Sequence, residues 1–405
     1  MSEIILAVTD ELVDRFRADA HQRELDRVLP YDEMALIAQS GLPGLIVPGD
    51  AGGPGADYPT VLEVVRRLAT ADPSLAQILM IHYCQLTMAL VNPATVRAEG
   101  SGGDLARFMA AEALAGRMIA SAIAERGTPS ALAYRTAVTR NEDGRLVLNG
   151  SKYYCTGSLF AHWLGVAAVA DTGERVKVLV PASAAGVDRV DDWNAFGQRL
   201  TGSGTVHFAD VIVDESLIFP TMTALAPTDE PAEPDLSSGL YAAACSNYHA
   251  AINVGIARNA ADDGFAFLRD KTRPWAYAGV AVANQEPHLL RLAGEISTSV
   301  TAAEALLAHS GARVQDAITT LTADTALAAR LAVAQAKTFG TETALSAATE
   351  LLTLGGTQAT DRSLNLDRHW RNARTHTTQD ATRWMMHYAG DAVVNGTAPP
   401  NTGRL

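Results

Sequence analysis

The chain has 405 residues, of which 48% are hydrophobic and 19% charged, and its formal net charge at pH 7 is -13. This length allows two or three domains around a large core. The acidic balance argues against a nucleic-acid partner and against docking on anionic lipid, because both require a basic face. Three widely spaced cysteines indicate neither a disulfide framework nor a zinc site. The acidic N-terminus and the lack of long apolar runs predict a cytoplasmic protein without a membrane span.

Residues 1–116 are predicted to form an N-terminal helical domain. Apolar residues recur there at three- and four-residue spacing, for example through residues 4–16 and 61–68. A turn with Pro48, Gly52 and Gly53 interrupts the helices.

Residues 117–220 are predicted to form a middle β domain, because the apolar period changes to two. The expected strands are residues 135–140, 145–149, 152–156, 163–170, 176–180 and 205–213. Their regular spacing is typical of a small antiparallel barrel or sandwich.

Residues 221–236, rich in proline and acidic residues, are predicted to be a linker. Residues 237–405 are predicted to form a C-terminal helical bundle, since they are rich in alanine and leucine at helical spacing. Few enzyme folds have the order helices, β domain, helical bundle.

The common catalytic signatures are absent from the sequence. It has no dinucleotide-binding glycine motif after a strand, no Walker loop, no zinc-protease motif and no nucleophile elbow. The spacing of His369, His376 and His387 does not make a metal pair, so no metal site is expected.

Two segments of the β domain could contact a flat ligand. Residues 149–158, N-G-S-K-Y-Y-C-T-G-S, could present backbone N–H groups and a hydroxyl to a planar ring, or could be a hairpin with a polar tip. Residues 191–204 contain Trp193, which could stack on a ring, and Arg199, which could pair with a phosphate. The alternative for this segment is a surface loop with a packed tryptophan.

Three further segments lie in the helical parts. The cations of residues 269–275 could hold a phosphate or could cap a solvated helix end. Gly355 and Gly356 allow close approach of a ligand, and four arginines follow within residues 362–374, either for anions or for salt bridges between helices. His82, on an apolar helix, is either a hydrogen-bonded core residue or a site residue.

Taken together, these segments resemble the acyl-CoA dehydrogenase superfamily over residues 10–395. The resemblance is carried by the loop at residues 45–53, the strand N-G-x-K-x-x-x-T at 149–156, and the stretch from Gly355 through residues 368–374. It implies an α+β, acyl-CoA dehydrogenase-like fold. Its parts are an N-terminal helical domain, a middle antiparallel β-barrel domain and a C-terminal four-helix bundle.

Residues 191–204, 273–275 and 370–376 are similar to the flavin-dependent monooxygenase branch, which includes dibenzothiophene monooxygenases and indole-oxidising enzymes of secondary metabolism. The resemblance implies a homotetramer supplied with FADH2 or FMNH2 by a separate NAD(P)H-flavin reductase. Reduced flavin and O2 would form a C4a-hydroperoxide. This species would oxygenate a small aromatic heterocycle at an indole-type ring carbon or a thiophene-type sulfur.

The resemblance also implies roles for individual residues. The implied catalytic residues are Ser121, Thr156, His82 and His376. The two histidines are candidates for proton donation, because histidine titrates near neutral pH. Other residues are implied to bind the flavin: Ala122 and Ile123 with Ser121 at the pyrimidine side, Tyr154 and Trp193 as walls, Lys271 and Arg273 from a neighbouring subunit with Arg199 at the phosphate, Gly355 and Gly356 at the tail, and Gln379.

Two alternatives remain open. Acyl-CoA dehydrogenases use a carboxylate base, and Asp380 occupies the corresponding position, one methylene shorter than the usual glutamate. A base displaced by about 1 Å can cost on the order of a hundredfold in rate, which weakens the dehydrogenase alternative. Relatives carry a histidine where this chain has Gln379. The second alternative is a non-catalytic scaffold that binds no flavin.

Overall fold

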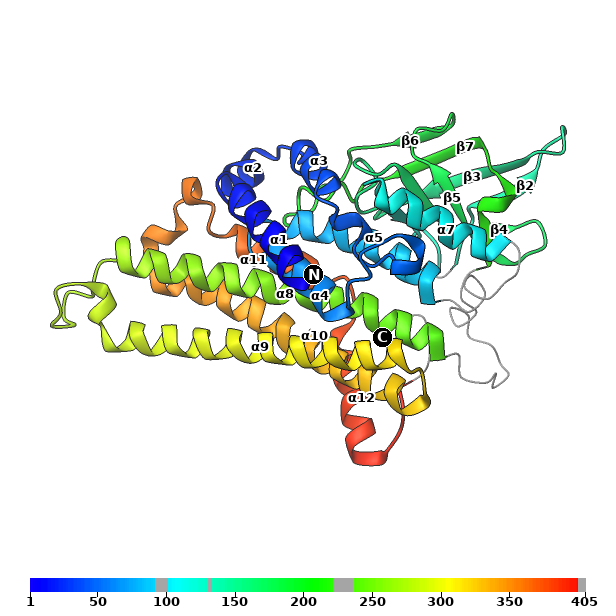
Figure 1. The fold of residues 1–405 in the computed structure, drawn as a ribbon. Coiled ribbons are helices and arrows are strands. Elements are labelled where there is room, and N and C mark those ends of the chain that lie inside the picture. Colours follow the sequence, from blue (N-terminus) through cyan, green and yellow to red (C-terminus); the bar gives the residue numbers. More distant parts are fainter. Residues whose placement is uncertain (92–100, 130–132, 221–235, 400–405) are drawn as a thin grey trace.

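The computed structural model describes residues 1–91, 101–129, 133–220 and 236–399. Within these residues an N-terminal helical part is followed by a β-sheet part and a C-terminal helical part (Figure 1). The predicted α+β fold class is therefore confirmed. The predicted linker, residues 221–236, lies outside the described residues except for Leu236, where a helix begins.

The N-terminal part consists of helices that pack around an apolar core. They are α1 (Ser2–Arg17), α2 (Ala20–Asp26), α3 (Tyr31–Gln39), α4 (Tyr58–Ala69), α5 (Pro73–Val91) and α7 (Ser101–Leu114). Helix α4 begins where the Asp57 side chain accepts the backbone N–H of Thr60 at 2.9 Å, which satisfies a free donor of the first turn. Helix α5 is apolar on all sides, as expected for a helix surrounded by protein.

The β part is one eight-stranded sheet with the order β6-β7-β3-β2-β4-β5-β8, and β1 pairs with β4. The strands are β1 (Ile119–Ala122), β2 (Ala137–Arg140), β3 (Leu146–Lys152), β4 (Trp163–Ala170), β5 (Arg175–Pro181), β6 (Val187–Arg189), β7 (Val206–Ile212) and β8 (Ile218–Pro220). Most pairs are antiparallel, while β1 and β2 both run parallel to β4. Alternate residues of the strands form an apolar core that belongs to the sheet part alone.

The predicted strand at residues 152–156 is wrong, because β3 ends at Lys152. Tyr154 adopts a left-handed backbone conformation with φ 58, which an extended strand cannot contain. The chain therefore turns at Tyr154, and Thr156 lies in a loop rather than on a strand.

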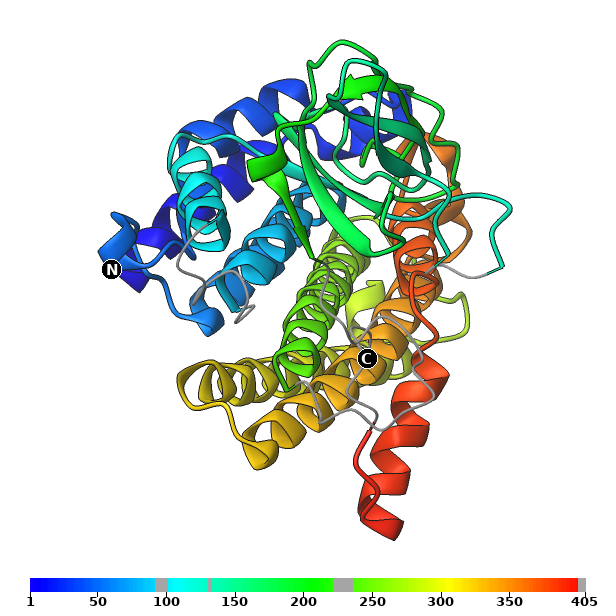
Figure 2. The ribbon, with the colours of Figure 1, turned by 90° about the vertical axis from the view of Figure 1, so that its right-hand side faces the viewer.

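The C-terminal part contains three long helices and two shorter ones. They are α8 (Leu236–Asp270), α9 (Pro287–Thr319), α10 (Ala323–Gly355), α11 (Arg368–Thr377) and α12 (Thr382–Asn395). Helix α8 contacts α4, α5, α9, α10 and α11, and small residues such as Gly255 let it approach α4 closely. Helix α12 projects beyond the bundle (Figures 1 and 2).

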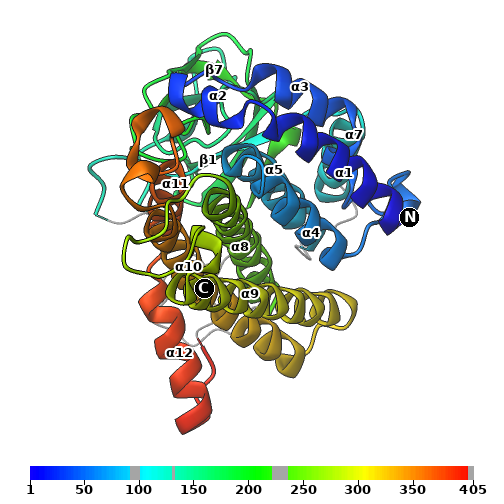
Figure 3. The same cartoon turned by 90° about the vertical axis from the view of Figure 1, so that its left-hand side faces the viewer.

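Helix α5 joins the three parts. It contacts α8 on one side and β1 on another, and Figure 3 shows it beside both. One face of β4 and β5 points away from the core of the sheet part and packs against α5 and α7. Helix α8 in turn contacts α10 and α11, so α5 and α8 connect the sheet to the rest of the bundle. No helix among the described residues is long and apolar enough to cross a bilayer.

Candidate active site

A cluster of hydroxyl groups lies in the loops after β3 and before β7. Thr156 Oγ1 is 2.8 Å from Ser203 Oγ, which is 2.7 Å from Thr201 Oγ1. Thr201 Oγ1 donates in turn to the Gln198 carbonyl at 3.0 Å. All three hydroxyl residues are buried, so the cluster holds the Thr156 hydroxyl in a fixed position.

An aromatic wall stands beside this cluster. Tyr154 is 60% exposed, and its ring meets that of Trp193 edge-on at 5.9 Å. Trp193 is fixed because its Nε1 donates to the Gln198 carbonyl at 2.8 Å. An exposed tyrosine held edge-on to an anchored tryptophan offers a flat ligand an apolar surface.

The loop at residues 191–204 is anchored to both helical parts. Gln198 N donates to Asn372 Oδ1 at 2.7 Å, and Gln198 Nε2 donates to Gln77 Oε1 at 2.8 Å. A Cβ at Gly197 would overlap the Arg371 carbonyl oxygen, so only glycine permits this approach. The loop is therefore a rigid connection between α5 and α11.

The Arg199 guanidinium already has a partner, Glu24, within the chain. Its Nη1 donates to the Glu24 carbonyl at 2.7 Å and lies 3.5 Å from the Glu24 carboxylate. Glu24 also binds Arg371 at 2.6 Å. This geometry does not support Arg199 as a phosphate ligand, because its charge is already neutralised.

The three residues predicted at the flavin's pyrimidine side lie at the end of β1 and directly after it. Ser121 is half-buried and pairs with Gly165 through the backbone, but its hydroxyl has no hydrogen-bond partner among the described atoms. Ala122 faces the barrel core. The Ile123 carbonyl accepts from Lys152 Nζ at 3.0 Å, and Lys152 also pairs with Glu125 at 2.7 Å. Of the three side chains, only Ser121 offers a free polar group.

His82 connects a loop to the sheet. Its Nδ1 accepts the Ile119 backbone N–H at 3.0 Å, and its Nε2 donates to the Pro43 carbonyl at 3.0 Å. Burial lowers the pKa of His82 to about 4, so the ring is neutral. Both nitrogens have main-chain partners, which leaves none for a substrate. His82 is therefore not available as a proton donor.

His376 belongs to a buried network that the sequence did not predict. Its Nδ1 donates to Asn253 Oδ1 at 2.7 Å, and Asn253 Nδ2 donates to Thr341 Oγ1 at 3.0 Å. Its Nε2 lies 3.0 Å from His249 Nδ1. These partners leave His249 Nε2 as the one ring nitrogen of the pair without a partner among the described residues.

Both histidines of this pair are held neutral. Burial and the nearby charge of Lys337 lower the pKa of His376 to about 3, although Asp380 opposes the shift. Burial and the same lysine hold the pKa of His249 well below its usual value. The proton on His376 Nδ1 fixes the tautomer, so His249 Nδ1 is the donor between the rings.

Asp380 forms an ion pair with Lys337 of α10. The Lys337 side chain is 4% exposed and that of Asp380 17%, so the pair is shielded from solvent. A carboxylate held by an ammonium group is a poor base, because removing a proton from a substrate would disrupt the pair. The arrangement weakens the dehydrogenase alternative.

Arg273, Gly355 and Gly356 share one surface pocket with Thr272, Thr357 and Gln358. Gly356 has φ 61 and open space where a Cβ would lie, and Arg273 is exposed without an ion pair among the described residues. Lys271 borders a different pocket, beside Asp263. Gln379 is exposed, just beyond α11. The α8–α9 connection, which contains Arg273, lies at the end of the bundle away from the sheet (Figure 1).

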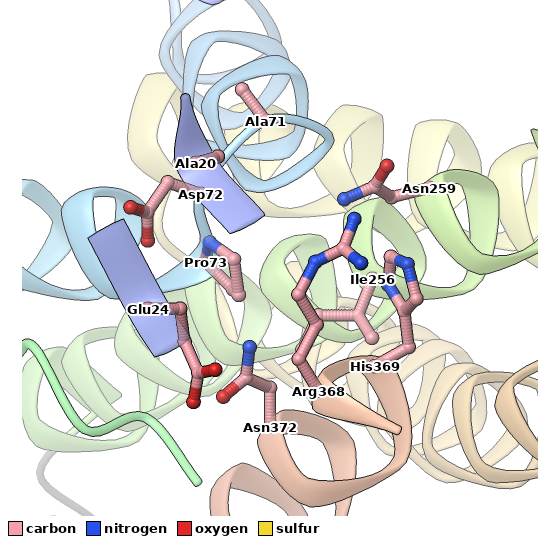
Figure 4. A pocket seen from close by; sticks show the side chains of 10 residues that line it. All are labelled: Ala20, Glu24, Ala71, Asp72, Pro73, Ile256, Asn259, Arg368, His369 and Asn372. Atoms are coloured by element: carbon pink, nitrogen blue, oxygen red, sulfur yellow. The ribbon is translucent and has the colours of Figure 1, made fainter. Parts of the chain in front are cut away.

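Two of the four arginines in residues 362–374 form salt bridges within the chain. Arg368 pairs with Asp263 at 2.7 Å and Arg371 with Glu24, as the salt-bridge alternative predicted. Figure 4 shows Arg368 and Glu24 at a junction between α2, α5, α8 and α11. Its cavity of about 10 Å³ is at the lower limit for one water molecule and cannot hold a substrate.

Family models match all three parts of the chain. The N-terminal domain of acyl-CoA dehydrogenase matches residues 3–97, the middle domain residues 120–211, and the C-terminal domain residues 247–384. The chain belongs to the acyl-CoA dehydrogenase family. The predicted superfamily is thereby confirmed.

Several relatives of this family member carry monooxygenase names. Dibenzothiophene monooxygenase of Rhodococcus qingshengii is 31% identical, covering 97% of this chain and 94% of its own length. A probable FMNH2-dependent monooxygenase of Pseudomonas putida is 29% identical, covering 97% of this chain and 95% of its own length. The structure of TdsC from Paenibacillus sp. A11-2 with FMN and indole matches with a TM-score of 0.87 and 28% identity. The match covers 99% of this chain and 100% of TdsC. The resemblance to the monooxygenase branch is confirmed.

Three buried polar residues of this family member escaped the sequence analysis: Lys177, His249 and Lys337. Each stands alone in an apolar strand or an alanine-rich helix, where the local pattern indicates packing. The one available signal was the spacing of His249 and Asn253, which places both on one helix face.

Proposed function

We propose that the chain is the oxygenase of a two-component system. It would receive reduced FMN from a separate NAD(P)H-dependent reductase and transfer one atom of O2 to a small aromatic heterocycle. The other oxygen atom would leave as water. The Lys337–Asp380 ion pair favours the oxygenase over the dehydrogenase alternative. Lys337 engages the carboxylate that would have to act as the base of a dehydrogenase.

The residues present fit a flavin mononucleotide. Tyr154 and Trp193 provide an aromatic wall, and the Thr156 hydroxyl lies next to it in a fixed cluster. Arg273 and the open backbone at Gly356 suit a phosphate. The sheet part and the α8–α9 connection lie at opposite ends of the molecule (Figure 1), so the aromatic wall and Arg273 would contact one cofactor only if separate subunits supply them. The proposal therefore includes a homo-oligomer, with a tetramer as the expected form.

Bound reduced FMN supplies the two electrons and the atom at which O2 is activated. The chain's own groups orient the reactants and exclude water. Thr156 Oγ1 would accept a hydrogen bond from the cofactor, because its own proton goes to Ser203. Ser203 in turn donates to Thr201, whose proton goes to the Gln198 carbonyl. Buried surfaces of α5 and α8 would keep the reacting region dry.

Proton transfer would be the task of the histidine pair. His249 Nε2 is the available nitrogen, and His376 would position the His249 ring through the contact with its Nδ1. Asn253 and Thr341 would keep His376 in one tautomer. His376 thus becomes a positioning residue in this proposal.

The decisive assay contains the purified chain, a flavin reductase, NADH, FMN, O2 and a panel of indoles and benzothiophenes. We expect a product heavier by one oxygen atom only when the chain is present. Thr156→Ala should release more hydrogen peroxide per NADH, whereas Thr139→Ala, at an exposed position of β2, should not. Absence of oxygenated product across the panel, with bound flavin reduced by an acyl-CoA, would favour the dehydrogenase alternative instead.

A further inference from the structure

Lys177 is a buried cation on the face of β5 that points away from the core of the sheet part. Leu179, two residues along the strand, packs on this face against α5 and α7. Lys177 is only 3% exposed. Its Nζ contacts the thioether Sδ of Met88 at 3.5 Å, which is a weak acceptor. A lysine this buried is normally paired with a carboxylate or bound to several oxygen atoms.

No carboxylate among the described residues neutralises Lys177. The titratable groups that act on it are the thiols of Cys84 on α5 and Cys245 on α8, and Lys337 of α10 acts on the same Cys84. The hydrogen bond to Cys245, together with burial, holds the pKa of Cys84 well above its usual value, so this thiol stays neutral. Lys337 brings a second cation that Asp380 already neutralises.

The buried region therefore carries an excess positive charge at neutral pH. Burial lowers the pKa of Lys177 to about 8, and the two thiols oppose the shift. At pH 7 the amine is still mostly protonated. An uncompensated cation in a nonpolar environment is costly, and a bound anion would remove most of that cost.

Further donors without partners border the same cluster. The Tyr248 hydroxyl is buried and has no hydrogen-bond partner among the described atoms, and its pKa is raised by burial and by the same two thiols. Ser121 pairs in register with Gly165 of β4. A Cβ at Gly165 would overlap Gln85 Oε1 and lie 3.1 Å from Lys177 Cε, so Ser121 shares a sheet face with Lys177.

We propose that Lys177 binds an anionic oxygen group of the substrate, a carboxylate or a sulfinate, with the Tyr248 and Ser121 hydroxyls as further donors. This inference rests on the proposed function, because it places the substrate between β5, α5 and α8. It narrows the substrate from any small aromatic heterocycle to one that carries an acidic group. The binding would be a charge-assisted hydrogen bond from the ammonium group to oxygen.

Binding to the purified full-length chain, with and without FMN, tests the proposal by calorimetry. The probes are indole-3-carboxylate and its uncharged counterpart indole-3-carboxamide. We expect the wild-type chain to bind the carboxylate at least tenfold more tightly at pH 7. Lys177→Met should abolish this preference, whereas Leu179→Met, on the same face of the same strand, should keep it. Equal binding of the two probes, or a preference that survives Lys177→Met, would overturn the proposal.

A second measurement does not depend on the folding of a variant. In the wild-type chain the preference for the carboxylate should decline as the pH rises from 7 to 10, because Lys177 loses its proton. A preference that stays constant over this range would also overturn the proposal. Binding of the two probes needs no turnover, so the binding results do not depend on the outcome of the reductase assay. That assay can succeed with neutral indoles when the carboxylate preference fails, or fail when the preference is present.

Discussion

His249 Nδ1 lies 3.0 Å from His376 Nε2, deep between α8 and α11. Because Asn253 Oδ1 holds the other nitrogen of His376 at 2.7 Å, the direction of the hydrogen bond between the rings is fixed. The pair therefore presents one nitrogen, His249 Nε2, for exchanging a proton with a ligand. Two side chains far apart in sequence act as one unit in this arrangement.

The first prediction concerns this unit. His249→Gln and His376→Gln should each lower the rate of product formation about a hundredfold and raise peroxide release, since positioned proton transfer contributes on that scale. The double variant should lose no more than the worse single variant, because both changes interrupt the same relay. Product and peroxide yields per NADH measure the effect, and His288→Gln, at an exposed position, is the control. Multiplicative losses in the double variant would show that the two rings act independently.

The second prediction concerns the Lys337–Asp380 pair. Asp380→Asn leaves a buried ammonium group unpaired and should lower the free energy of unfolding by about 3–5 kcal/mol. Replacing both partners, Lys337→Met with Asp380→Leu, should restore much of that loss. Urea unfolding of the three variants makes the comparison. If Asp380→Asn is as stable as the wild-type chain, the pair is not the buried contact described above.

The third prediction concerns the pocket of Arg273 and Gly356. Arg273→Gln should weaken FMN binding about tenfold or more, because one charge-assisted contact to the phosphate is lost. Binding of riboflavin, which has no phosphate, should not change. Arg291→Gln, at an exposed position of α9, serves as the matched control. An equal loss for both flavins would indicate a general change of shape rather than a phosphate contact.

The fourth prediction concerns acid stability. His82 has a folded-state pKa of about 4, below its usual 6.5. Between pH 6.5 and 4 the unfolded chain therefore binds more protons than the folded chain. The stability from the neutral ring is fully present above pH 6.5 and is lost as the pH falls toward 4, by about 3 kcal/mol in total. His82→Gln should flatten the fall of the urea midpoint between pH 6.5 and 4. A slope as steep as that of the wild-type chain would contradict the assignment.

Much of the fold could be predicted from local pattern. Long helices and strands such as β4 show their period over many residues, so residues 163–170 were predicted with the observed bounds. Strands β1, β6 and β8 were not predicted, since three or four residues cannot display a period. The turn at Tyr154 was missed because a positive φ at tyrosine has no sequence signal.

The site was harder to predict because its chemistry depends on tertiary partners. Arg273 was expected at the phosphate of the flavin and the Gly355–Gly356 pair at its tail, and these residues share a pocket. Arg199 has the same residue type as Arg273, but Glu24 engages it, and no local pattern reveals that contact. Lys177 lies in a valine-rich strand, where its burial beside Met88 emerges only from the packing of α5.

The central claim is tested most directly by turnover in ¹⁸O2. The purified chain is mixed with reductase, NADH, FMN and an indole or benzothiophene substrate, and the product is analysed by mass spectrometry. Transfer of one oxygen atom from O2 predicts that the product carries a single ¹⁸O. Product oxygen derived from solvent, or bound flavin reduced by an acyl-CoA with no oxygenated product, would contradict it.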